Sequence, residues 1–161
     1  MKGKTAQQLL DELKADPAWR ARRAEQERAL AERDIAAAMD ESELVAELRA
    51  AGYDVDSVYD LVNTAPHPVL PRRFVGPYPA AYPVLVRHLE LPHLPAIREG
   101  IIRALTVKDG GSMVEAALLA AFKRETHPPM RWVVANALRT AMPPHRRRKY
   151  PEISAALKTA G

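Results

Sequence analysis

Two stretches of this chain have nearly the same order of residue types 33 positions apart: AIREGIIRALT at 96–106 and PMRWVVANALR at 129–139. The register holds over two successive apolar stripes, and the matched pairs are Leu85 with Leu118, Leu89 with Phe122, Pro95 with Pro128, Arg98 with Arg131, Ala104 with Ala137 and Leu105 with Leu138. The apolar spacing in each copy is that of a helix, a short turn and a second helix. Because one such hairpin cannot bury its apolar faces alone, the repeat predicts an all-α fold of stacked hairpins, an α-solenoid.

The chain divides into an N-terminal helical arm at 1–40 and a helical repeat domain at 41–161. In the arm, Thr5 and Gln8 predict a capping box for a short first helix. A second helix is expected from Pro17 to about Met39, with a thin apolar stripe among many Arg and Glu residues. The expected parts of the repeat domain are a hairpin at 41–64, a proline-rich loop at 65–83, repeats at 84–108 and 112–141, and a capping helix at 150–160.

Local signals set the expected ends of several helices in the repeat domain. Gly52 is the usual type of residue after the last turn of a helix. Residues 54–64 start with acidic side chains, which favour a helix N-terminus, so a helix is expected there. Ser112 and Glu115 predict a second capping box at the start of the later repeat.

The proline-rich loop holds six prolines in residues 65–83. Long loops in compact domains are often functional, which makes Arg72, Arg73 and Phe74 candidates for partner binding, together with Tyr78 and Tyr82. The alternative is that the loop's apolar side chains only cover the core.

The second helix of each repeat resembles the HEAT repeat family, including the related phycobilisome-lyase-type repeats found in bacteria. Residues 96–105 and 130–138 carry the resemblance through an early arginine and a late Ala-Leu pair. It covers about 80–160 well and 42–64 loosely, and it implies a short right-handed α-solenoid of HEAT-like hairpins. Unlike the family's common pattern, neither turn supplies an aspartate. Arg98 and Arg131 are therefore expected to pair elsewhere, for instance with Glu99 or Glu125, or to face solvent.

Composition excludes several classes of function. The chain has no cysteine, so thiolate chemistry and disulfides are absent, and no apolar stretch predicts a signal peptide or a membrane span. We therefore expect a cytoplasmic protein without a membrane partner. The five histidines show no metal-binding spacing, those at 93 and 127 suggest turn chemistry beside prolines, and no catalytic or nucleotide-binding motif occurs. We expect no enzyme activity, cofactor or metal.

Positive charge gathers at the C-terminal end. The net charge of +4 is the sum of −2 for residues 1–50, −1 for 51–100 and +7 for 101–161. Four adjacent basic residues and an aromatic ring form a cluster that suits phosphate contacts and base stacking; its members are Arg146, Arg147, Arg148, Lys149 and Tyr150. Some HEAT-like proteins are DNA glycosylases with basic faces, and Trp132 beside Arg131 is faintly similar to them. The alternative is an exposed turn that interacts with a helix C-terminus.

These observations favour a non-enzymatic protein–protein interaction module, either an adaptor or an immunity-type binder of a bacterial kind. Nucleic acid binding through the C-terminal basic cluster is the alternative. Trp132 is a candidate contact on the repeats. Trp19 is a candidate anchor on the arm, for a partner or for a second copy of the chain in a homodimer, unless it fastens the arm to the core.

Overall fold

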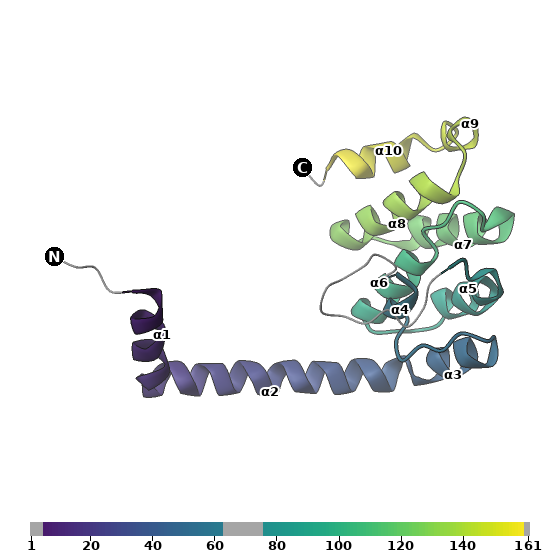
Figure 1. Ribbon diagram of the computed structural model, residues 1–161. Helices are drawn as coiled ribbons and strands as arrows, with labels where there is room; N and C mark the ends of the chain where they lie inside the picture. The colour runs from purple at the N-terminus through teal and green to yellow at the C-terminus, as the bar shows by residue number, and fades with distance from the viewer. Residues whose placement is uncertain (1–4, 63–75, 160–161) are drawn as a thin grey trace. The chain divides into compact units, whose positions relative to one another are not determined.

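The computed structural model describes residues 5–62 and 76–159, and all regular elements in these ranges are helices (Figure 1). The all-α prediction is therefore confirmed. The chain divides into two compact units, residues 1–38 and 39–161. In the described ranges no helix is both long enough and apolar enough to cross a bilayer.

The first unit contains α1 (Ala6–Ala15) and most of α2 (Pro17–Asp40). The predicted capping box is present, since the Gln8 amide donates to the Thr5 hydroxyl and the Thr5 amide donates to the Gln8 side chain. The Asp16 carboxylate accepts from the Ala18 amide at 2.9 Å and so caps the start of α2. Neither helix has a buried residue. The exposed large apolar side chains of these two helices are Leu9, Leu10, Leu13, Leu30, Ile35 and Met39.

The second unit is built from two rows of helices. Its elements are α3 (Ser42–Ala50), α4 (Tyr59–Val62), the 3₁₀ turn η1 (Pro79–Ala81), α5 (Tyr82–Glu90), α6 (Pro95–Ala104), α7 (Gly111–Arg124), α8 (Pro128–Ala141), α9 (Pro144–Arg147) and α10 (Pro151–Lys158). In one row α3 contacts α5 and α5 contacts α7; in the other, α4, α6, α8 and α10 contact in succession (Figure 1). Contacts between α5 and α6 and between α7 and α8 join the rows.

The sequence repeat marks both helix starts and core positions. Pro95 and Pro128 begin α6 and α8, where a proline is favoured because the first helical residue has no partner for an N–H group. Four matched pairs of the repeat have side chains that are at most 1% exposed. They are Leu85 with Leu118, Leu89 with Phe122, Ala104 with Ala137 and Leu105 with Leu138.

Gly100 lets α6 approach the segment before α4 closely. A Cβ atom at this position would lie 2.6 Å from Val58 Cγ1 and 2.9 Å from Tyr59 Cε2. The Tyr59 hydroxyl donates a hydrogen bond to the Ala96 carbonyl at 2.7 Å, which fastens α4 to the first turn of α6. Only a residue without a side chain fits this contact.

The helix predicted over 54–64 is wrong at its start, because α4 begins at Tyr59. The Glu41 carboxylate accepts from the Ser57 hydroxyl at 3.1 Å and from the Val58 amide at 2.9 Å. The Asp60 carboxylate accepts from the amides of Asp56 and Ser57. These side chains satisfy the amides that a helix would otherwise engage, so the segment stays irregular.

The capping box predicted at Ser112 is also wrong. Helix α7 begins one residue earlier, at Gly111, and no side chain caps it. Glu115 is buried and pairs with Arg146 at 2.9 Å between Oε1 and Nη2. Gly111 has a φ of +64°, which glycine adopts without strain, so the turn needs no side-chain cap to form.

The loop predicted at 65–83 ends earlier than expected. Residues 63–75 lie outside the described part, so the candidates Arg72, Arg73 and Phe74 are not placed. Tyr78 and Tyr82 are buried, and their rings meet edge to face with centroids 5.7 Å apart. The Tyr78 hydroxyl donates to the Ala104 carbonyl at 2.8 Å. Burial raises the pKa of Tyr78 to about 12, with a smaller contribution from a nearby carboxylate. Both tyrosines therefore have a structural role.

Candidate partner-binding surfaces

A pocket of about 560 Å³ lies along α6 and the first turns of α8. It is lined by Pro95, Ala96, Glu99, Arg103, His127, Pro129, Met130, Trp132 and Val133. Glu99 and Arg103 form an ion pair of 2.7 Å one turn apart on α6, and this pair supplies the charged wall. The lining also includes Pro129 and the half-buried Trp132. An apolar surface beside a charged wall suits an inserted apolar side chain with a polar flank.

The two copies of the sequence repeat place different side chains at equivalent positions in this pocket. Glu99 on α6 and Trp132 on α8 occupy equivalent positions, 33 residues apart. Both lie on the accessible side of their helices, unlike the matched leucines and alanines of the core. The two copies therefore contribute different side chains to the pocket, a carboxylate at position 99 and a large ring at position 132.

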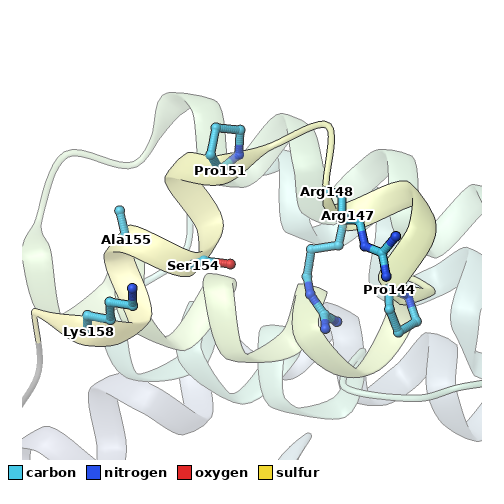
Figure 2. Close-up of a pocket in the computed structure, with 7 residues that line it drawn as sticks. All are labelled: Pro144, Arg147, Arg148, Pro151, Ser154, Ala155 and Lys158. Carbon is cyan, nitrogen blue, oxygen red and sulfur yellow. The ribbon is translucent and has the colours of Figure 1, made fainter.

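The C-terminal basic cluster surrounds a second pocket, of about 510 Å³, between α9 and α10. Figure 2 shows its lining residues, with the Ser154 hydroxyl pointing toward Arg147 and Arg148 at the end of α9. The cationic side chains at this pocket are Arg147, Arg148 and Lys158. The positive charge predicted from the sequence is thus gathered around a hollow between two short helices.

Part of the basic cluster is already used inside the protein. Arg147 Nη1 donates to the carbonyls of Arg139 at 2.7 Å and Met142 at 3.2 Å, which satisfies the end of α8. Arg146 pairs with Glu115. Tyr150 is half-buried, with the Lys123 ammonium 5.9 Å from its ring centre. In the described ranges, Arg148 and Lys149 are exposed and make no ion pair.

Trp19 lies near the start of α2 and is half-buried. The Arg23 guanidinium lies 5.9 Å from the centre of its ring, one turn along the helix. Arg23 also pairs with Glu27 at 2.8 Å. Trp19 therefore makes a contact within its own helix, and its role as a partner anchor stays a prediction.

Arg98 and Arg131 hold equivalent repeat positions but make different contacts. Arg98 Nη2 lies 3.6 Å from Glu125 Oε2, so its predicted pairing with Glu125 is confirmed. Arg131 Nη1 donates to the carbonyls of Phe122 at 2.7 Å and Glu125 at 2.9 Å. Its guanidinium also stacks 3.9 Å from the centre of the Phe122 ring. Arg131 thus caps the C-terminal end of α7.

A chain of hydrogen bonds that the sequence analysis missed joins four titratable residues. His93 Nδ1 lies 2.9 Å from Asp40 Oδ2, His93 Nε2 lies 3.0 Å from His88 Nδ1, and His88 Nε2 lies 3.3 Å from Glu47 Oε2. Arg87 also forms an ion pair with Glu47. The prediction of turn chemistry for His93 was incomplete, because its carboxylate partner comes from the end of α2, 53 residues earlier.

The number of protons on the two imidazoles limits how many of these three contacts are hydrogen bonds at the same time. Three contacts need three protons, whereas two neutral imidazoles supply two. All three contacts are therefore hydrogen bonds at once only when one of the two imidazoles carries both ring protons. Burial lowers the pKa of His88, and the positive charges of His93 and Arg87 add to this, while Glu43 opposes it. Among the described residues no group of three acidic or histidine side chains is placed to hold a metal ion.

No sequence signal near the histidines pointed to this network. His88 lies between Leu85 and Leu89 on the apolar stripe of α5, which indicates burial but names no partner. Its partners are Glu47 and His93, which lie 41 and five residues away in the sequence.

Comparison of the chain with known protein families, curated proteins and solved structures gave no match.

Proposed function

We propose that this chain is a non-enzymatic protein-binding module, an adaptor or immunity-type binder, built as a short right-handed α-solenoid of HEAT-like hairpins. The two rows of successive helix contacts support the stacked arrangement. So does the 33-residue spacing of Pro95 and Pro128, which begin equivalent helices. Stacked hairpins suit binding because their accessible residues vary without disturbing the core.

The observation that carries the binding proposal is the half-buried Trp132 in the pocket along α6 and α8. Core packing does not require a tryptophan here, because the equivalent position in the preceding repeat holds Glu99. Tryptophan is enriched among the residues that contribute most to protein interfaces, since it removes a large area from water at little entropic cost. We infer a protein partner that inserts an apolar side chain against Trp132 and bonds to the Glu99–Arg103 pair.

Affinity purification of the tagged chain from a lysate of its source organism tests this proposal. Three baits are compared: the original chain, Trp132→Ala, and Met113→Ala as a control at another exposed apolar side chain. The expected result is one protein recovered near stoichiometry by the original chain and the control, with recovery at least tenfold lower for Trp132→Ala. Equal recovery with all three baits contradicts the assignment of the pocket.

Nucleic acid binding is the second candidate, favoured by the exposed cations beside the pocket between α9 and α10. Arg148, Lys149 and Lys158 make no ion pair in the described part of the chain. If they contact phosphates, replacing Arg148 and Lys149 by alanine weakens DNA binding and makes it less dependent on salt. Arg147 is unsuitable for this test because it caps α8. Unchanged DNA affinity, measured by fluorescence anisotropy at two salt concentrations, excludes this candidate.

A further inference from the structure

A continuous chain of contacts joins the last residue of α2 to α3, to α5 and to the turn between α5 and α6. Its members, all in the second unit, are Asp40, His93, His88 and Glu47. Both imidazoles lie inside the protein, since the side chains of His88 and His93 are 1% and 6% exposed. The rings are inclined by 32° with their centres 5.2 Å apart, so they meet edge to edge through two nitrogens that lie 3.0 Å from each other.

The number of protons on the two rings decides whether this chain of contacts is complete. With two protons, one of the three contacts places two acceptors against each other. With four protons, both nitrogens of the central contact carry a proton, and two positive rings face each other at 3.0 Å. Three protons give each contact one donor and one acceptor. The distances of 2.9, 3.0 and 3.3 Å are therefore best explained by a pair of rings with one positive charge.

The charges around the pair favour one positive charge on it. The charged groups that act on the two rings come from three elements; they are Asp40 at the end of α2, Glu43 and Glu47 on α3, and Arg87 on α5. Glu47 already pairs with Arg87. Within the described residues Asp40 pairs with no lysine or arginine, and its cationic contact is His93. The charge of Asp40 is therefore balanced only when His93 is positive.

The positive charge belongs on His93 rather than on His88. The shorter of the two carboxylate contacts, 2.9 Å, joins His93 Nδ1 to Asp40, whereas His88 Nε2 lies 3.3 Å from Glu47. Burial lowers the pKa of His88, and the positive charges of His93 and Arg87 lower it further, while an acidic neighbour on α3 opposes them. His93 then donates from both of its nitrogens, and His88 donates from Nε2 to Glu47.

We propose that His88 and His93 form a pH-dependent latch, which links Asp40 to Glu47 when His93 carries both ring protons and opens when His93 loses one of them or His88 gains a second. The latch connects distant parts of the sequence, since 53 residues separate Asp40 from His93 and 41 separate Glu47 from His88. Asp40 also accepts from the Leu94 amide at 3.1 Å, so the latch holds the backbone of the turn as well. The proposal is independent of the Trp132 pocket and gives the fold a response in the pH range where histidine changes charge.

NMR of the full-length chain, labelled with nitrogen-15 in histidine, counts the protons on each ring. The nitrogen shifts distinguish protonated from unprotonated ring nitrogens, and His88→Gln and His93→Gln assign the signals. At pH 5 we expect three protons on the pair, on both nitrogens of His93 and on Nε2 of His88. The exposed His127 and His145 should carry both protons at this pH, because the ordinary histidine pKa is about 6.5. At pH 9 the pair should hold two protons.

A matched pair of variants tests the role of Asp40. Asp40→Asn keeps an oxygen that accepts from His93 and Leu94 but removes the negative charge, so the fraction of His93 with both protons at pH 6 should fall at least twofold. Asp54→Asn removes an exposed carboxylate that makes no hydrogen bond or ion pair within the described residues, and it should leave this fraction unchanged.

The proton count is made on the original chain, so it decides the question even where Asp40→Asn does not fold. Two or four protons on the pair at pH 5, a charge on His88 instead of His93, or equal fractions of charged His93 in the two folded variants would overturn the proposal.

Discussion

Arg131 is expected to contribute more to stability than an ordinary surface arginine. It donates to two carbonyls at the end of α7 and stacks on Phe122. A net hydrogen bond from a charged group contributes about 1.5–3 kcal/mol, and an accessible cation over a ring about 0.5–1 kcal/mol. Since the side chain is partly exposed, the lower ends of these ranges apply. Both hydrogen bonds come from one nitrogen, Nη1, so together they contribute about 2.5 kcal/mol, and the stacking adds about 0.5 kcal/mol. Arg131→Ala should therefore lower the free energy of unfolding by about 3 kcal/mol.

Urea unfolding followed by the helical circular dichroism signal measures this loss. With a slope of about 2 kcal/mol per M, a loss of about 3 kcal/mol lowers the midpoint by about 1.5 M urea. Arg131→Lys should fall between Arg131→Ala and the original chain, because lysine keeps the charge but lacks the planar guanidinium that stacks on Phe122 while its Nη1 donates to both carbonyls.

Arg124→Ala is the matched control, because Arg124 is exposed in the last turn of α7 and makes no ion pair or hydrogen bond within the described residues. Its midpoint should stay within about 0.25 M of the original, as expected for a change of at most about 0.5 kcal/mol at a surface position. If Arg131→Ala and Arg124→Ala give the same midpoint, the capping argument is refuted.

Three further changes test other contacts. Gly100→Ala should lower the free energy of unfolding by about 1–2 kcal/mol, because overpacking against Val58 costs more than the gain from the higher helix propensity of alanine. In a double-mutant cycle, Val58→Ala should reduce the destabilisation caused by Gly100→Ala. Burial lowers the pKa of His88 in the folded protein, so as the pH falls below the ordinary histidine value of 6.5 the unfolded chain binds a proton before folded His88 does. The stability that His88 contributes is therefore present above this pH and lost below it. The difference between the thermal midpoints at pH 7 and pH 5 should be smaller for His88→Gln than for the original chain. Trp132→Ala should remove the partner while changing the thermal midpoint by less than about 3 °C, since its ring is partly exposed.

Apolar periodicity was enough to predict the helical core. The matched leucines of the repeat are buried because a period of 33 residues returns equivalent positions to equivalent places in successive hairpins. The predictions that were wrong concern helix starts that depend on polar side chains. Residues 54–58 carry acidic side chains typical of a helix start, but Glu41 takes the Val58 amide from 17 residues away. A partner so distant in sequence leaves no local signal.

The basic cluster shows the same limit for the candidate site. The sequence predicted a run of positive charge but could not tell which cations were free. Arg146 is held by Glu115, and Arg147 by carbonyls at the end of α8. The position of Glu115 in the repeat suggested a capping role, so nothing in the sequence marked it as a partner of Arg146. The remaining exposed members, Arg148 and Lys149, define a smaller surface than the sequence implied.

Arg98 and Arg131 show why a repeat determines the core more firmly than the surface. Both follow a helix-starting proline by three residues, at Pro95 and Pro128. Arg131 caps the helix that precedes it in its own hairpin, whereas Arg98 reaches Glu125 at the end of the next hairpin's first helix. Apolar contacts need only the right size and face, while an arginine takes the acceptor that its surroundings provide. Equivalent polar positions therefore diverge first, and the exchange of Glu99 for Trp132 is the same divergence on the side of the repeat that a partner can reach.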